Sequence, residues 1–293
     1  MTNEIKTISI EDKDYPKKLK EIKNAPEVLY YRGKMITNEP CFGIVGTRMC
    51  SSYGRQSALE IANDLTEAGL TIVSGFAQGI DTSAHLGVLE RGKRTIAVLG
   101  TGLDEKSVYP QSNLKLIEKV LENNGLLISE YPPGTSGSKF SFPNRNRIIS
   151  GLCLGILVIE AKTRSGALIT AEWARKQERK VFALPGSIYS QNSKGCHYLI
   201  KQGAKLVENA QDILKGLKLD TGLFKLNHKK EIKGENEAEK IILFALSQEA
   251  LYIDKIIEKT KLNPAKVAST LSNLEIKDKI RNLGGNIYAI SNR

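Results

Sequence analysis

The residue types best suited to binding chemistry gather between Lys139 and Arg147, in the run KFSFPNRNR. A lysine and two arginines, one of them Arg145, lie there beside two phenylalanines, one of them Phe142. Aromatic rings stack on unpaired bases while cations hold phosphates, so this mixture suits single-stranded nucleic acid. The alternative is a basic helix start on a solvated surface, with Pro143 as its first residue. We favour binding, because a solvated helix start does not need exposed phenylalanines.

Two further loops combine a cation with small residues. Arg48 follows the apolar run CFGIVG, and residues 164–166 (RSG) follow the run LGILVIEA. Each loop precedes a helical pattern, and the free amides at a helix N-terminus bind anions. Ser74 and Gly75 open a third segment, SGFAQGID, whose small residues let the backbone approach a ligand closely.

The elements that must position these loops alternate along residues 41–217. Apolar, β-branched runs predict strands at 41–46, 70–75, 95–100, 126–131, 154–161, 180–186 and 205–209, and helical patterns include 53–68, 79–91, 111–123 and 166–178. Strands that are apolar on both faces and separated by helices predict a doubly wound, Rossmann-like, mostly parallel sheet of the α/β class. Because parallel strands end at one edge of a sheet, we expect the cationic loops to form one groove.

The remaining segments flank this domain. Residues 1–40 are expected to form a lead-in that packs on the sheet, and the polar, aperiodic residues 218–236 a linker. Residues 237–293 predict a small winged helix, with helices near 237–247, 252–259 and 264–276 and a hairpin at Gly284 and Gly285. Its third helix offers only Lys266 as a cation before Lys277, so we expect an accessory module and not the main DNA-binding surface.

Composition excludes several classes of protein. The 293 residues carry a net charge of +11 and are 41% hydrophobic, which indicates a globular protein with a polyanionic partner. No apolar run is long enough to cross a bilayer, and the N-terminus lacks the apolar region of a secretory signal. The four cysteines show no metal-binding spacing. We therefore expect a cytoplasmic protein that binds neither membrane nor metal.

The sequence offers little for catalysis. The loop GTRM lacks the glycines of a dinucleotide fingerprint, and GVLERGKR at 87–94 lacks the hydroxyl residue that ends a P-loop. None of the three histidines lies in a motif that pairs a nucleophile with a base, and His85 on a helical pattern is best explained as a packed or surface residue. We therefore predict no catalytic residues, no cofactor and no enzyme activity.

The order of these motifs resembles the DNA-processing protein A (DprA/Smf) family. The matching stretches are GTR (46–48), SGFAQGIDTSAH (74–85), GTGLDEKSVYPQSN (100–113), FPNRNRIISG (142–151), EAKTRSGALITAEWA (160–174) and LPGS (184–187). The resemblance implies a protein that protects incoming single-stranded DNA and loads RecA recombinase on it during natural transformation. It also implies a homodimer formed through the Rossmann-like domain.

The family's DNA pocket, carried over position by position, gives the core of a predicted site, and the small residues beside it complete the set. The predicted single-stranded DNA-binding residues are Thr47, Arg48, Ser74, Gly75, Lys139, Phe142, Arg145, Asn146, Arg147, Arg164, Ser165 and Gly166. Two departures from the family pattern stand out. The helical N-terminal module of some members is not expected here, and His197 stands where the family usually has asparagine.

A competing prediction, from a different class, is an enzyme. The expected fold also resembles nucleotide phosphoribohydrolases, which carry a glycine-rich Pro-Gly-Gly signature at a helix start. Here the corresponding segment is SGALITAE, from Ser165 to Glu172, and its glycine run is lost. Thr170 and Glu172 are therefore expected to be ordinary helix residues, and release of ribose 5-phosphate from AMP would distinguish the two predictions.

Overall fold

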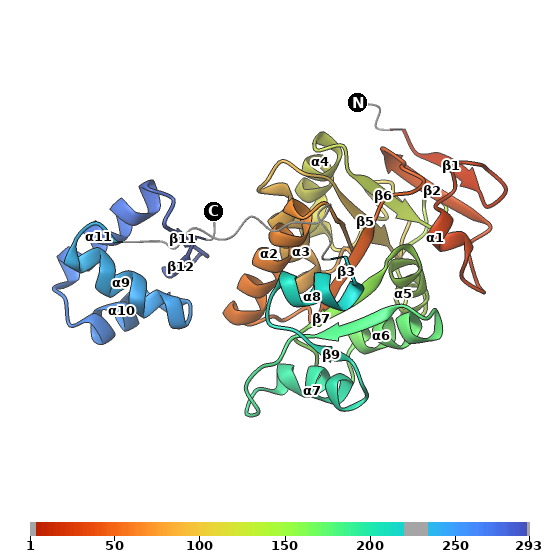
Figure 1. Ribbon diagram of the computed structural model, residues 1–293. Coiled ribbons are helices and arrows are strands. Elements are labelled where there is room, and N and C mark those ends of the chain that lie inside the picture. The colour runs from red at the N-terminus through yellow and green to blue at the C-terminus, as the bar shows by residue number, and fades with distance from the viewer. Residues whose placement is uncertain (1–3, 220–233, 292–293) are drawn as a thin grey trace. The chain divides into compact units, whose positions relative to one another are not determined.

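The protein is described from a computed structural model that covers residues 4–219 and 234–291 (Figure 1). Most of the predicted linker, residues 220–233, lies outside the described residues. The chain forms two compact units, the first built on a nine-stranded sheet and the second on three helices and a small sheet. In the described ranges no helix is both long and apolar enough to span a membrane.

The first unit carries a sheet with the strand order β1-β2-β6-β5-β4-β3-β7-β8-β9. Neighbours from β6 to β9 in this order run parallel, as the sequence predicted. The bounds of these parallel strands are β3 (Cys41–Gly46), β4 (Thr71–Ser74), β5 (Thr95–Leu99), β6 (Leu126–Ser129), β7 (Gly155–Ile159), β8 (Lys180–Ala183) and β9 (Lys205–Leu206).

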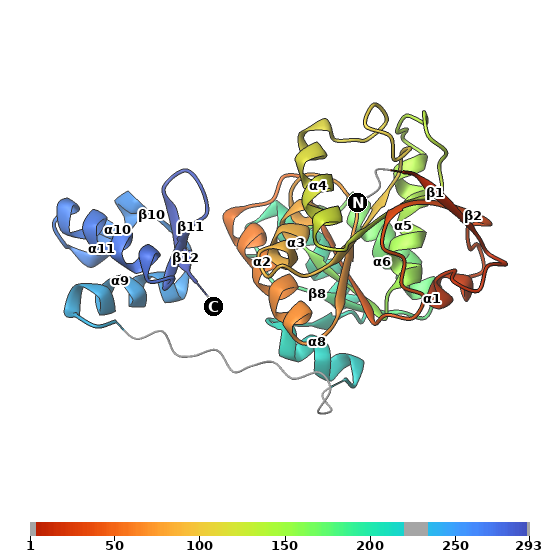
Figure 2. The ribbon, with the colours of Figure 1, turned by 90° about the horizontal axis from the view of Figure 1, so that it is seen from above.

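Helices cover both faces of the sheet (Figure 2). One face packs on α1 (Lys17–Lys20), α5 (Ser141–Leu152), α6 (Gly166–Lys176) and α7 (Lys194–Lys201). The other packs on α2 (Ser52–Glu67), α3 (Ile80–Leu89), α4 (Leu114–Glu122) and α8 (Ala210–Leu217). Short 3₁₀ turns, Gln111–Asn113 and Gln191–Ser193, precede α4 and α7. The predicted doubly wound α/β fold is therefore confirmed.

Alternation along the strands explains the two layers. Successive side chains of a strand point to opposite faces. In β3, Val45 belongs to the core on the α5 side and Ile44 to the core on the α2 side. In β4, Val73 and Ile72 divide in the same way. The strand that follows β3 in the chain, β4, lies on one side of it, and β7 lies on its other side. The strand order reverses between β3 and β7, and a doubly wound sheet opens a crevice at such a point.

The N-terminal lead-in does more than pack on the sheet. Strands β1 (Lys6–Ser9) and β2 (Val28–Gly33) extend the sheet, and β2 pairs antiparallel with β6. Between them, Tyr15 and Leu19 are buried on the α5 face. The strands were not predicted, because an antiparallel addition at an edge depends on a distant partner, here the otherwise unpaired side of β6.

The second unit has the elements of a winged helix. Its helices are α9 (Glu237–Gln248), α10 (Ile253–Thr260) and α11 (Pro264–Ile276), and its strands are β10 (Leu251–Tyr252), β11 (Ile280–Asn282) and β12 (Ile287–Ile290). The strands form an antiparallel sheet in the order β10-β12-β11. Gly284 and Gly285 have positive φ in the turn between β11 and β12, as the predicted hairpin requires.

Candidate nucleic-acid interface

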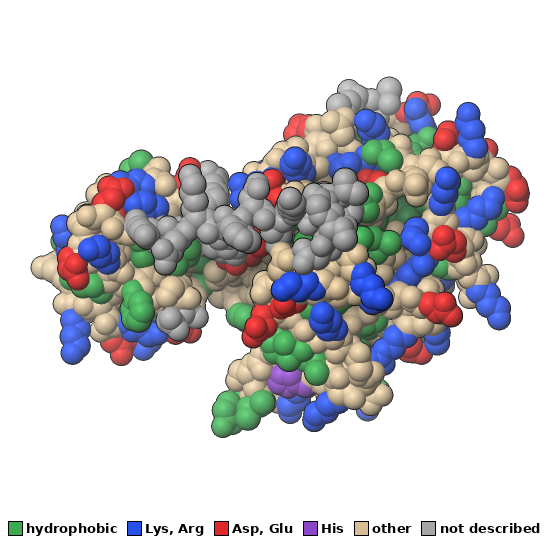
Figure 3. Space-filling view, viewed as in Figure 1, with side chains coloured by type: hydrophobic (Ala, Val, Ile, Leu, Met, Phe, Trp, Pro, Cys, Tyr) green, Lys and Arg blue, Asp and Glu red, His purple; other side chains and the backbone are tan. Residues whose placement is uncertain are grey.

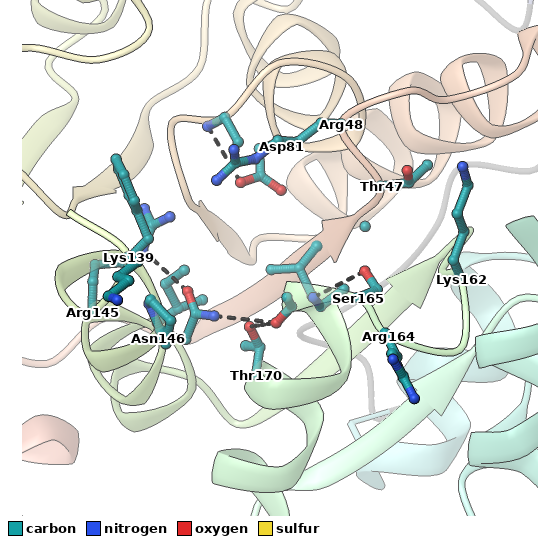
Figure 4. Close-up of a pocket in the computed structure, with 18 of the residues that line it drawn as sticks. Thr47, Arg48, Asp81, Lys139, Arg145, Asn146, Lys162, Arg164, Ser165 and Thr170 are labelled. Atoms are coloured by element: carbon teal, nitrogen blue, oxygen red, sulfur yellow. Dashed lines mark hydrogen bonds between the residues drawn. The ribbon is translucent and has the colours of Figure 1, made fainter. Parts of the chain in front are cut away.

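A cavity of about 630 Å³ opens at the carboxyl ends of the parallel strands (Figure 4). Its walls are the loop after β3, the start of α3, the segment that leads into α5, and the loop between β7 and α6. These are the loops that carry the predicted cations. The three cationic segments, 46–48, 139–147 and 162–166, therefore meet at one cavity, as expected for loops that follow neighbouring parallel strands.

Four exposed cations surround this cavity. Arg48 comes from the loop after β3, Lys139 from the segment before α5, and Lys162 and Arg164 from the loop after β7. None of the ion pairs within residues 4–219 and 234–291 involves any of the four. Arg48 is also attracted by the buried carboxyl group of Asp81 without forming an ion pair, so all four rim cations remain available to phosphate. Lys162 was not in the predicted set, although the motif KTRSG contains it.

The location of charge on the surface does not by itself reveal this site. In Figure 3, lysine and arginine side chains are scattered over the visible face of the first unit, with acidic side chains among them. What distinguishes the cavity is the convergence of cations that lack an acidic partner. A net charge of +11 therefore gives the class of partner but not its position.

Arg145 lies on the floor of the cavity beside Asp81, and each is 6% exposed. Its Nη1 donates a hydrogen bond to the carbonyl oxygen of Val98. Burial raises the pKa of Asp81 to about 6, and the positive charge of Arg145 opposes that rise. Burial also lowers the pKa of Arg145 to about 10, so the guanidinium stays charged at neutral pH. Arg145 therefore lines the floor of the site, where the charge of Asp81 attracts it, whereas the rim cations are exposed.

Ser74 and Gly75 lie beneath the cavity and do not line it, which corrects their predicted place. Ser74 is fully buried, and its Oγ donates a 2.6 Å hydrogen bond to the carbonyl oxygen of Ile44. A Cβ at Gly75 would lie 2.2 Å from Asp81 Oδ2 and 2.8 Å from Arg145 Nη2. Gly75 is thus needed so that Asp81 and Arg145 can meet. Ser74 and Gly75 therefore support the floor of the cavity without lining the cavity.

Gly79 in the same motif holds the Arg48 loop. Its φ of +79° favours glycine, and a Cβ there would lie 2.4 Å from the carbonyl oxygen of Thr47. The same carbonyl oxygen accepts a 3.2 Å hydrogen bond from the amide of Ile80. Thr47 itself is 9% exposed, and its Oγ1 accepts a 3.3 Å hydrogen bond from the amide of Met49. Thr47 therefore shapes the loop that carries Arg48.

The N-terminus of α6 faces the cavity. Ser165 caps this helix, because its Oγ accepts a 3.3 Å hydrogen bond from the amide of Ala167. No atom lies within 4 Å of a Cβ built on Gly166, so the backbone is open at that point. Asn146 fixes the turn through Nδ2, which donates a 3.2 Å hydrogen bond to the Gly166 carbonyl oxygen. The arrangement is that of an anion site at a helix N-terminus.

Arg147 is the predicted site residue that the structure does not bring to the cavity. Its Nη2 forms a 2.5 Å ion pair with Glu130 Oε1, and the Arg147 side chain lines a separate cleft with Trp173 and Gln177. Residues two apart on a helix are turned by about 200°, so Arg145 and Arg147 must point to opposite sides of α5. Arg147 therefore does not line the cavity with the rest of its segment, and its contact with DNA stays a prediction.

Phe142 is half-buried and not exposed as predicted, whereas Phe140 is 72% exposed. The guanidinium of Arg48 lies over the Phe142 ring, 5.6 Å from its centroid. Helix α5 begins at Ser141, so Pro143 is its third residue and not its first. Phe142 thus supports Arg48 as well as lining the cavity.

Of the residues considered for catalysis, Thr170 lines the cavity, where its Oγ1 donates a 3.4 Å hydrogen bond to the Gly166 carbonyl oxygen, whereas His85 and Glu172 do not line it. His85 is fully buried, with Nε2 2.7 Å from the Gly75 carbonyl oxygen and Nδ1 2.8 Å from Thr95 Oγ1, and burial lowers its pKa to about 4. Glu172 forms an exposed ion pair with Lys176. Within the described residues, no cluster of three His, Cys, Asp or Glu side chains could hold a metal ion. His197 Nε2 lies 3.0 Å from the Gly186 carbonyl oxygen.

Comparison with known families decides the relationship. The sequence pattern of the family described as "DNA recombination-mediator protein A" matches residues 6–218. This chain belongs to that family. The pattern described as "DprA winged helix domain" matches residues 229–286. The resemblance predicted from the motifs is therefore confirmed, as is the winged helix that follows them.

Individual members of the DNA recombination-mediator protein A family extend this result. DNA processing protein DprA of Streptococcus pneumoniae is 50% identical over 209 residues, which cover 71% of this chain and 73% of the relative. DNA processing protein DprA of Bacillus subtilis is 42% identical over 215 residues, 73% of this chain and 71% of the relative. These relatives align with most of this chain.

Two solved structures of family members share the fold. The X-ray structure of DNA processing protein A from S. pneumoniae superposes with a TM-score of 0.67 at 48% identity, over 73% of this chain and 74% of the other. DNA processing protein A from Helicobacter pylori superposes with a TM-score of 0.65 at 30% identity, over 75% of this chain and 99% of the other, and is described with a single-stranded DNA binding mode.

Proposed function

We propose that this protein binds single-stranded DNA in the cavity between β3 and β7. The observation that carries the proposal is a set of four rim cations that surround one cavity and form no ion pair among the described residues: Arg48, Lys139, Lys162 and Arg164. The phosphate backbone of a DNA strand that passes over the rim can contact all four cations. The open N-terminus of α6 adds backbone amides at Gly166 for one of the phosphates.

The shape of the site favours a single strand over a duplex. The cations encircle a hollow of about 630 Å³ and do not line a flat track. In a duplex the bases are paired and stacked inside, so they cannot enter such a hollow. An unpaired strand can turn its bases toward aromatic side chains while the cations hold its phosphates. The H. pylori relative, described with a single-stranded DNA binding mode, supports this choice.

We further propose that the bound strand is protected and transferred to RecA recombinase, and that the protein acts as a homodimer. Membership of a recombination-mediator family supports the transfer, because a mediator delivers single strands to a recombinase. Natural transformation is one process that needs this step. No residue of the chain is assigned a catalytic role in this function.

Fluorescence anisotropy with labelled oligo-dT and with a duplex of equal length tests DNA binding. We expect the single strand to bind more tightly than the duplex and with little sequence preference. Equal affinity for the two would contradict the proposal. Recombinase transfer is tested separately, by measuring RecA filament formation on single strands coated with a single-strand-binding protein, with and without this protein.

A further inference from the structure

A second cavity, much smaller at about 30 Å³, adjoins the first at Phe142. Both cavities are lined by Arg48, Phe142 and Arg145, and the second is completed by Gln78, Gly100, Tyr109 and Pro110. It lies where the loop that follows β5 meets the start of α5. A strand held over the first cavity can therefore continue across the surface beside the second, over Tyr109.

Tyr109 is the exposed aromatic side chain of this second cavity. It is 53% exposed, and its ring centroid lies 5.8 Å from that of Phe142 at an interplanar angle of 50°. Large aromatic rings are normally buried, so an exposed ring beside a cationic cavity is a marker of a contact surface.

The exposure of Tyr109 is imposed by a well-fastened loop. Val108 before it is 1% exposed, and the carbonyl oxygen of Val108 accepts a 2.9 Å hydrogen bond from Gln111 Nε2. Asp104 Oδ2 accepts hydrogen bonds from the amide and the hydroxyl of Ser107, at 3.2 and 2.8 Å. These contacts fix the backbone on both sides of Tyr109. Its ring is thus presented to solvent in a defined place, with little conformational entropy left to lose on binding.

Phe142, by contrast, has little free ring surface. Arg48 lies over its ring, and glycines pack against its edge from two sides. A Cβ at Gly100 would lie 2.9 Å from Phe142 Cδ1, and one at Gly137 would lie 2.4 Å from Phe142 Cζ. Phe142 is thus a support between the cavities, and the ring available to a base on its far side is that of Tyr109.

We propose that Tyr109 stacks on a base of the bound single strand, next to the nucleotide whose phosphate Arg48 holds. The proposal rests on the proposed function, and it adds a base subsite to a phosphate site. Stacking on a phenol ring requires no particular base, so the subsite is tolerant of sequence. The amide of Gln78 contacts Ser112 Oγ at 3.2 Å beside this subsite and offers polar groups at its rim.

The first test replaces Tyr109 in the full-length protein. Tyr109→Ala is expected to raise the Kd for a dT20 strand about tenfold, which corresponds to about 1.4 kcal/mol of binding free energy. Tyr109→Phe keeps the ring and is expected to restore the affinity. Tyr252→Ala is the matched control, because Tyr252 is 55% exposed and lines neither cavity. Unchanged affinity of Tyr109→Ala, while the intact protein binds, overturns the stacking subsite alone; absence of binding by the intact protein overturns the proposed function as well.

The second test keeps an aromatic ring and does not depend on an affinity loss. In a Trp173→Phe background, which removes the chain's single tryptophan, Tyr109→Trp places an indole in the subsite. Saturation with dT20 is expected to quench the indole emission, because a base stacks on it. Unchanged emission at saturation, with binding confirmed by anisotropy, overturns the proposal.

Discussion

Replacing Arg48 by alanine tests whether the rim cations bind phosphates. Each neutralised phosphate of a single strand contributes about 0.7 to the slope of log K against log salt concentration. If each of the four rim cations contacts one phosphate, the slope is about −2.8, and Arg48→Ala should reduce it to about −2.1. Between 50 and 200 mM salt, the affinity should fall about fifty-fold for the intact protein and about twenty-fold for the variant.

Two further variants serve as controls for the Arg48 measurement, which uses anisotropy titrations with dT20 at four or more salt concentrations. Lys176→Ala removes the same charge from an exposed position on α6 that pairs with Glu172 and does not line the cavity, so its slope should match that of the intact protein. Phe142→Ala removes the support under Arg48 without removing charge, so it should weaken binding at nearly constant slope. A slope for Arg48→Ala equal to that of the intact protein would refute the phosphate assignment.

Three other perturbations follow from the same geometry. Gly79→Ala forces a Cβ to within 2.4 Å of the Thr47 carbonyl oxygen and should displace the Arg48 loop, so the DNA affinity should fall at least about tenfold while the circular dichroism spectrum stays native. His85 has a folded-state pKa of about 4, below its unfolded value, so its contribution to the free energy of unfolding is present above pH 6.5 and declines toward pH 4, by about 3 kcal/mol in all. Urea titrations should therefore show a smaller loss of stability between pH 6.5 and pH 4 for His85→Gln than for the intact protein. Asp81, whose pKa is raised, acts in the opposite direction in both proteins. Truncation after Gly234 should change the affinity for dT20 less than about tenfold, because Lys277 and Lys279 are already paired with Glu235 and Glu239; a larger loss would make the winged helix a primary DNA-binding surface.

The sequence by itself determined the architecture of the first unit and the class of its partner. Strands that are apolar on both faces, with helical patterns between them, allow little besides a parallel sheet covered on both sides. Once the sheet is parallel, the loops that follow its strands must meet at one edge, so the sequence groups Arg48, Lys139 and Arg164 in one site. The family motifs could be identified from the sequence because each consists of residues that are consecutive in the chain.

The tertiary structure alone decided which of the predicted residues face the cavity. Arg145 and Arg147 have the same chemistry and lie two positions apart, yet the twist of α5 sends one to the cavity floor and the other to Glu130. Ser74 and Gly75 act from beneath, because the packing of Asp81 against Arg145 leaves no room for a side chain. Tyr109 lies in a stretch that matches the family, yet it was not predicted as a site residue, since its place beside the cavity depends on a distant residue, Phe142. Local patterns fix the type and order of elements, whereas the direction of each side chain is set by contacts between residues far apart in the chain.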